Sequence, residues 1–142
     1  MEGFNDITQN YMTLHTGGAC TFNPPANTQT GTSNNGNTDC SLNSAVGCSV
    51  QGPAGSYGVP FNANGGGVYA MEWTSKAIKI WSFPRNAVPT DITAGTPDPS
   101  TWGLPAGNFD SSYGSCNIDE QFPAQTIVSC SISPLFCVYP MA

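Results

Sequence analysis

The residues that could carry chemistry are few and scattered along the chain. One histidine, His15, and nine carboxylates occur among 142 residues, and neither a G-x-S-x-G motif nor a phosphate-binding loop is present. A lone histidine in a strand is more often packed or hydrogen-bonded than catalytic. Glu72, in an apolar run, favours a structural role, either buried and paired or exposed at a rim. From these residues alone, no particular activity is predicted.

Six cysteines could form disulfides or bind a metal. They stand at positions 20, 40, 48, 116, 130 and 137 without any C-x-x-C pair, which is poor geometry for zinc. Disulfides in an oxidising compartment are therefore expected, with fifteen complete pairings open. We expect Cys20, Cys40 and Cys48 to tie down the loop-like residues 17–66, and Cys116 to reach one of them or a cysteine of the tail. No metal and no cofactor are expected.

Charge excludes two classes of partner. Only 8% of the residues are charged and the net charge is −6, whereas nucleic acids and anionic membrane surfaces require clustered Lys and Arg. No apolar run is long enough to span a bilayer. The first residues, Met1 to Phe4, have neither the basic start nor the apolar core of a signal peptide. Because the composition is that of a secreted protein, we expect the natural protein to start elsewhere.

The strongest structural signal is a hairpin. Residues 67–74 and 78–83 alternate in the manner of strands, three glycines precede them, residues 74–77 supply the turn and Pro84 ends the second run. Both faces carry large apolar groups, so we expect the hairpin inside a stack of sheets. Its aromatic residues, Trp73 included, are expected in the core, with stacking on a sugar as the alternative.

The other segments predict an all-β protein. Residues 11–16 read as a strand with Tyr11, Thr13 and His15 on one face. The proline-rich residues 88–103 favour extended surface segments, residues 116–122 favour one helical turn, and residues 125–129 favour a last strand. No helix of normal length is predicted. The expected layout is a β-sandwich.

A series of motifs in a fixed order adds a resemblance. The chain carries MEG at residues 1–3, NYMTLHT at 10–16, DC at 39–40, GC at 47–48, SYG at 56–58, GGGVYAMEWT at 65–74, IKIW at 78–81 and PDPSTWG at 97–103. This set resembles the C-terminal part of a fungal glycoside hydrolase family 16 enzyme, most closely the secreted endo-β-1,3(4)-glucanases, or laminarinases. The similarity runs from residue 1 to about Val128.

The resemblance implies a fold and its limits. It implies a concanavalin-like jelly-roll β-sandwich of two curved antiparallel sheets, with an open glucan cleft across the concave face. Residues 1–142 would form a single partial catalytic domain whose N-terminal strands are missing. Residues 129–142 would form an off-pattern tail, because the family's usual ending is not found there.

The family's catalytic signature, Glu-x-Asp-x-x-Glu followed by Gly, overlaps this chain only at its end. The resemblance implies that Glu2 is the general acid/base, and that the nucleophile and an assisting aspartate lie upstream of residue 1. A retaining glycosidase uses two carboxyl groups about 5–5.5 Å apart. The implied activity is therefore hydrolysis of O-glycosidic bonds in β-1,3(4)-glucans by a retaining mechanism, and this chain alone is expected to be inactive.

Two further residues are implied to bind substrate. His15 would line the cleft near the leaving group, and Trp102 would stack on a sugar from a loop outside the core. The implied partner is β-glucan polysaccharide, and either the missing N-terminal half or a second copy of the chain would complete the domain. Secretion to the extracellular space is implied. The alternatives are a non-catalytic glucan-binding module and an inactive fragment.

Overall fold

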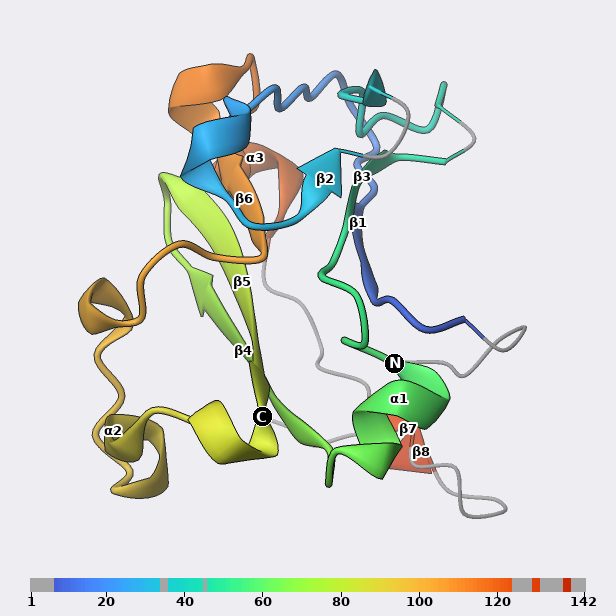
Figure 1. Cartoon of the computed structure of the whole chain (residues 1–142). Coiled ribbons are helices and arrows are strands. Elements are labelled where there is room, and N and C mark those ends of the chain that lie inside the picture. The colour runs from blue at the N-terminus through green and yellow to red at the C-terminus, as the bar shows by residue number, and fades with distance from the viewer. Residues whose placement is uncertain (1–6, 34–35, 45, 124–128, 131–136, 139–142) are drawn as a thin grey trace.

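Two three-stranded antiparallel sheets organise the described part of the chain (Figure 1). The computed structural model describes residues 7–33, 36–44, 46–123, 129–130 and 137–138. The first sheet, in the order β1-β3-β2, contains β1 (Tyr11–Leu14), β2 (Thr32–Ser33) and β3 (Cys48–Gln51). The second, in the order β4-β5-β6, contains β4 (Gly67–Trp73), β5 (Ala77–Pro84) and β6 (Gly107–Asp110). A separate ladder pairs β7 (Ser129–Cys130) with β8 (Cys137–Val138). The predicted all-β class with two antiparallel sheets is confirmed.

The described helices are short. They are α1 (Gly58–Ala63), α2 (Thr90–Thr93) and α3 (Ile118–Gln121), with 3-10 turns η1 (Ala26–Thr28), η3 (Arg85–Ala87), η4 (Pro99–Thr101) and η5 (Ser111–Tyr113). The helical turn expected near residue 118 is confirmed, and the Asn117 side chain caps it. The extended conformation expected for residues 88–103 is wrong at α2 and η4. Pro89 and Pro99 stand at the start of these turns, where a missing N–H costs nothing.

The predicted hairpin is confirmed, but its place in the sheet is not. β4 and β5 pair from Gly67↔Pro84 to Trp73↔Ile78, and the Thr74 hydroxyl oxygen accepts the Ala77 N–H at 3.1 Å to close the turn. β4 lies at the edge of its sheet rather than inside a stack. Trp73 is 40% exposed and touches Phe122 edge-on. The expectation that Trp73 is a core residue is therefore wrong.

The long segment interpreted as loop contains the central strand of the first sheet. β3 pairs with β1 on one side and β2 on the other. Its four residues are too few to show a clear alternation, so sequence patterning missed it. The expectation that cysteines tie this segment down is confirmed by two disulfides, Cys20–Cys116 and Cys40–Cys48. The side chains of Cys130 and Cys137 lie outside the described part of the chain.

The core lies between the two sheets. Phe109 and Ile78 of the second sheet are each 2% exposed, and the Phe109 ring meets Phe22 edge-on at 5.8 Å between centroids. Met12 of β1 packs against Gly107 of β6, where any Cβ would come within 3.0 Å of the Met12 sulfur. The remaining buried core residues are Cys20, Cys40, Cys48, Val50, Ala106, Cys116 and Ile118. Both disulfides are thus part of the core.

One crossing segment joins the sheets. The Gly31 N–H donates to the Ala106 carbonyl at 2.9 Å beside β6, and Thr32 then pairs with Gln51 of β3. A Cβ at Gly31 would lie 2.4 Å from the Ala106 oxygen, so only glycine fits this crossing. Because this crossing segment bonds to both sheets, the relative position of the sheets is defined by backbone hydrogen bonds as well as by the core.

Two expectations fall on undescribed parts of the chain. Of the strand expected at residues 125–129, only Ser129 is described, in β7. Glu2 also lies outside the described residues. Within the described ranges, no helix has the length and apolar character needed to cross a membrane.

Truncation of Phe109 and of Trp73 should have unequal effects on stability. Phe109→Ala removes a buried ring from the contact between the sheets and should cost about 3–5 kcal/mol. Trp73→Ala removes a ring that is 40% exposed on an edge strand and should cost only about 1–2 kcal/mol. Urea unfolding of the two variants measures both values, and equal losses would show that Trp73 is covered in solution.

Candidate functional site

The outward face of the first sheet carries side chains suited to hydrogen bonding. Along β1, Met12 points into the core, while Tyr11, 43% exposed, and Thr13 point outward, followed by the exposed His15. The alternation predicted for residues 11–16 is thus confirmed. On β3, Ser49 stands opposite Thr13 and Gln51 stands opposite Tyr11; Gln51 is half-buried and Ser49 is buried. We call Tyr11, Thr13, His15, Ser49 and Gln51 the β1–β3 face.

The polar groups of this face are partly tied to one another. The hydroxyl oxygens of Thr13 and Ser49 lie 2.8 Å apart. The Gln51 side-chain amide donates to the Gln9 oxygen at 2.8 Å, and the Gln9 amide donates to the Gly52 carbonyl at 3.1 Å. These bonds hold the side chains in defined positions, so a ligand would meet a preorganised surface. The face carries no carboxylate and no cation.

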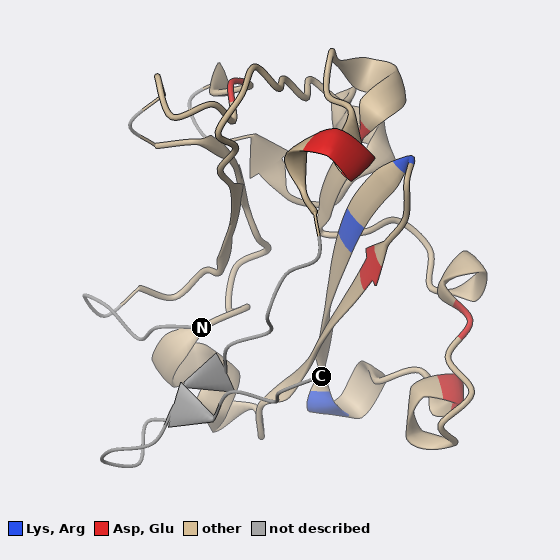
Figure 2. Cartoon of the chain, turned by 180° about the vertical axis from the view of Figure 1, so that it is seen from behind, with Lys and Arg blue, Asp and Glu red and all other residues tan. Residues whose placement is uncertain are grey.

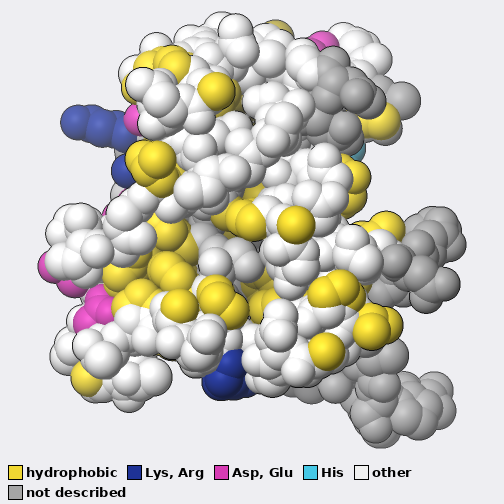
Figure 3. Space-filling model, viewed as in Figure 1, with side chains coloured by type: hydrophobic (Ala, Val, Ile, Leu, Met, Phe, Trp, Pro, Cys, Tyr) yellow, Lys and Arg dark blue, Asp and Glu magenta, His cyan; other side chains and the backbone are white. Residues whose placement is uncertain are grey.

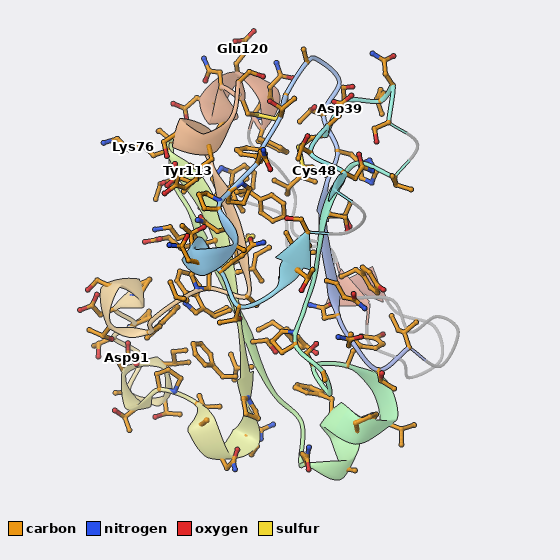
Figure 4. The ribbon with its side chains drawn as sticks, turned by 45° about the horizontal axis from the view of Figure 1, so that its top comes forward. Asp39, Cys48, Lys76, Asp91, Tyr113 and Glu120 are labelled. Carbon is orange, nitrogen blue, oxygen red and sulfur yellow. A yellow bond between two sulfur atoms is a disulfide. The ribbon has the colours of Figure 1, made fainter. Side chains whose placement is uncertain are left out.

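The backbone at His15 is held on both sides by a small disulfide loop. Leu14 pairs with Cys48, while the Thr16 N–H donates to the Cys40 carbonyl at 2.8 Å. Cys40 and Cys48 are bonded to each other, which ties both supports together. The Asp39 carboxylate, at the same end of the molecule as Cys48 in Figure 4, accepts the Ser41 N–H at 2.9 Å and shapes the loop.

Gly47 lies directly against the His15 ring. Its φ of +64° lies in the left-handed region, and a Cβ there would stand 2.7 Å from His15 Cε1 and 2.5 Å from the Leu14 carbonyl oxygen. Neither contact is tolerable, so the glycine is required both by its backbone and by the ring it touches. Sequence analysis missed Gly47 as a site residue, although its position next to Cys48 was a visible signal.

Trp102 belongs to a different cluster. Its ring meets Trp81 and Phe83 edge-on, with centroids 5.2 and 5.7 Å away, on the face of β5 opposite the core. Its indole N–H donates to Asp91 Oδ2 at 2.7 Å. In the view of Figure 3, hydrophobic side chains gather beside acidic ones on the side where Figure 1 shows α2. Trp102 thus lies outside the core between the sheets, as expected, although it packs against other aromatic rings. The structure does not bring it together with His15.

The seven described carboxylates serve local structure, as their scattered positions in Figure 2 suggest. Glu72 lies 3.8 Å from Lys79 across the hairpin, which confirms its structural role. Four others accept backbone N–H groups in turns and caps: Asp39, Asp91, Asp98 and Asp110. Asp119 and Glu120 stand in the first turn of α3. Across the described ranges, no group of three or more His, Cys, Asp or Glu side chains could hold a metal ion.

Comparison with known proteins gives a consistent result. A family model described as the XgeA-like, catalytic GH16 domain matches residues 1–137. A probable endo-1,3(4)-β-glucanase of Aspergillus fumigatus is 43% identical over 96% of this chain, which spans 20% of that relative. The endo-1,3(4)-β-glucanase xgeA of Emericella nidulans is 41% identical over 96% of the chain, which spans 21% of its length.

Solved structures show the same relationship. An elongating GH family 16 β-1,3-glucosyltransferase superposes with a TM-score of 0.76 at 48% identity, over 84% of this chain and 39% of that one. Laminarinase 16A from Phanerochaete chrysosporium superposes with a TM-score of 0.74 at 44% identity, over 86% of this chain and 42% of that one. That laminarinase structure contains β-glucans in its donor and acceptor sites. This chain therefore matches about two fifths of the length of each of these solved structures.

Gly47→Ala should disturb His15, whereas Gly95→Ala should not. Both glycines have positive φ, so each substitution should cost about 1–2 kcal/mol through the backbone. Nothing lies within 4 Å of a Cβ at Gly95, so only Gly47→Ala also displaces a neighbour. We expect the imidazole NMR signals of His15 to shift in Gly47→Ala alone. Unchanged imidazole signals in a folded Gly47→Ala variant would contradict the contact between Gly47 and the His15 ring.

Asp91 should make the aromatic cluster sensitive to acid. The hydrogen bond from the Asp98 N–H, supported by the Trp102 indole, holds the pKa of Asp91 below 3.8, although burial acts against this. The charged form is thus favoured by folding, and its stabilisation is present above pH 3.8 and is lost as the pH falls through the folded-state pKa. Thermal unfolding of wild type and Asp91→Asn should differ at pH 5, and the difference should shrink as the pH falls below 3.8 through the lowered pKa. A constant difference between the two proteins across this range would be the contrary result.

Proposed function

Because the chain belongs to the XgeA-like catalytic domains of glycoside hydrolase family 16, we propose that it acts in the hydrolysis of O-glycosidic bonds in β-1,3(4)-glucans. The observation that carries this proposal is the match of the family model to residues 1–137. The chain spans only about a fifth of the Aspergillus and Emericella relatives named above, so the activity of the whole enzyme is part of the proposal.

Glu2 is the proposed general acid/base of a retaining mechanism. In such a mechanism one carboxylate attacks the anomeric carbon, while a second carboxyl group about 5–5.5 Å away protonates the leaving oxygen. The negative charge of the nucleophile also raises the pKa of its neighbour, so that the acid is protonated when it is needed. Glu2 thus depends on its partner for its protonation state as well as for the chemistry.

The described residues offer no nucleophile. Glu72 is paired with Lys79 on the other sheet, and the remaining described carboxylates are placed at turns, caps and α3. In the proposed mechanism, the second carboxylate comes from the part of the family domain that precedes Glu2. The 142-residue chain by itself is then a glucan-binding surface with half of the catalytic pair.

The β1–β3 face is the proposed binding surface. Hydroxyl, amide and imidazole groups match the hydroxyl groups of a glucan, and the exposed Tyr11 ring offers a flat apolar surface for the C–H face of a sugar. His15 is proposed to lie near the leaving group. The related laminarinase, which holds β-glucan oligosaccharides, supports this choice of ligand. Binding of sugar by Trp102 stays a prediction, because its described contacts are to Trp81, Phe83 and Asp91 rather than to the β1–β3 face.

Secretion is part of the proposal. The two disulfides suit an oxidising compartment, since cytosolic thiols are kept reduced. A second candidate function, a glucan-binding module without catalysis, is favoured by one observation: the described β1–β3 face is polar but carries no carboxylate.

The isolated chain should bind β-1,3-glucan without hydrolysing it. We expect retention on insoluble β-1,3-glucan and no release of reducing sugar from laminarin above the level of a Glu2→Gln variant. His15→Ala should weaken retention about tenfold, the effect expected for the loss of one hydrogen-bonding side chain. Ser75→Ala, an exposed change in the hairpin turn of the other sheet, is the matched control and should leave retention unchanged.

Supplying the preceding family segment, covalently or in trans, should restore hydrolysis, and Glu2→Gln should then abolish it, because an amide cannot protonate the leaving oxygen. Turnover by the isolated chain that depends on Glu2 would show that the chain contains its own nucleophile. The proposed division of the catalytic pair would then be wrong. Failure to bind any β-glucan would contradict the proposal that β-glucan is the substrate.

A further inference from the structure

A cavity lies at the end of the hairpin, away from the β1–β3 face. It has a volume of about 420 Å³ and is lined by Asn64, Pro84, Arg85 and Asn86. Asn64 ends α1 just before β4, while Pro84 ends β5 and Arg85 begins η3. Figure 1 shows α1 and η3 near the same end of the hairpin. All four lining residues are exposed, so this cavity is an open depression on the surface.

Arg85 is anchored in this cavity with its fork of donors free. Its backbone N–H donates to the Gly66 carbonyl at 2.9 Å, and its side-chain Nε donates to the Gly65 carbonyl at 3.1 Å. Gly65 and Gly66 have φ values of +82° and +74°, which turn these carbonyls toward the arginine. Nε is thereby fixed, while no described residue bonds to the terminal Nη groups. A guanidinium held in this way presents a rigid pair of donors.

Arg85 also has no carboxylate partner among the described residues. Among the described residues, the one ion pair is Lys79–Glu72, and the chain as a whole carries nine carboxylates against three cations. Since η3 and the turn of the hairpin are separated by the length of β5, Lys76 lies roughly 25 Å away at the opposite end. Arg85 therefore has donors to offer to a ligand.

The other lining groups decide between an anion and a sugar. Asn64 and Asn86 each add a carbonyl acceptor as well as an NH₂ donor, and no described residue bonds to either side chain. A phosphate or sulfate accepts hydrogen bonds but has few or none to give, so the amide oxygens would face it unpaired. A sugar hydroxyl both donates and accepts. Pro84 supplies an apolar surface for C–H groups, and an exposed cation attracts an anion only weakly because water screens it.

We propose that this cavity, the Arg85 pocket, is an auxiliary saccharide site that binds an uncharged glucan segment through two adjacent free hydroxyl groups. The fork of a guanidinium matches two neighbouring oxygens. A β-1,4-linked glucosyl unit has its O2 and O3 hydroxyls free and adjacent, whereas an interior β-1,3-linked unit has O3 in the linkage. The Arg85 pocket should therefore prefer β-1,4-linked segments. This site goes beyond the proposed function and uses neither Glu2 nor His15.

The test is an NMR titration of the 142-residue chain with cellotetraose, laminaritetraose and sodium sulfate as separate probes. Cellotetraose should shift the side-chain signals of Asn64, Asn86 and Arg85 Nε, and laminaritetraose should shift them at about tenfold higher concentration or not at all. Arg85→Lys keeps the charge but loses the fork, so its affinity for cellotetraose should fall about tenfold. Lys76→Gln, at the other end of the hairpin, is the matched control and should titrate as wild type.

Other results would overturn the proposal. Displacement of cellotetraose by sulfate, or stronger shifts with sulfate alone, would make the pocket an anion site. Equal binding of both tetrasaccharides would contradict the preference for β-1,4 linkages. Unchanged binding by Arg85→Lys would show that the guanidinium does not recognise the sugar. Asn86→Ala gives a second probe that leaves both arginine–glycine hydrogen bonds in place. Because His15→Ala should leave these shifts intact, failure here is distinguishable from failure of the β1–β3 face.

Discussion

The architecture depends on one covalent link, the Cys20–Cys116 disulfide between the segment after β1 and the segment after β6. It joins residues 96 positions apart, and its closure restricts the unfolded chain by about 4–5 kcal/mol in the loop-entropy model. Around it, the Ser115 N–H donates to the Thr21 carbonyl and Ile118 is fully buried. In a chain with few charges and short strands, the two sheets stay in contact through this link, the core and the backbone hydrogen bonds of the Gly31 crossing.

The β1–β3 face follows from that contact. Met12 of β1 is buried against Gly107 of the second sheet, so the alternation of the strand turns Tyr11 and Thr13 outward. The local Cys40–Cys48 loop then defines the position of His15 through backbone bonds on both sides. Two disulfides therefore support His15. Cys20–Cys116 helps to orient its strand, and Cys40–Cys48 helps to position its ring.

Sequence patterning predicted the features that repeat and missed those that depend on distant contacts. The β4–β5 hairpin and the faces of β1 follow from period-two alternation and turn residues, so they were predictable. β3 was missed because four residues show no clear period. Trp73 was assigned to the core although it is exposed on an edge strand, and the aromatic packing around Trp102 was not foreseen. Burial of a tryptophan depends on which strand lies at the edge of the sheet and on partners such as Asp91, and neither is visible locally. Gly47 is recognisable as a site residue only once the ring beside it is seen.

The two disulfides also differ in the chain length that they close. Cys40 and Cys48 are eight positions apart, so their ring can close while most of the chain is still disordered. The Cys20–Cys116 bond needs most of the described sequence to be made and brought together. During synthesis, the surroundings of His15 would thus acquire a disulfide early, from a segment that has already emerged. Joining of the sheets is the later event, and it is the step at which errors of pairing with the other cysteines would arise.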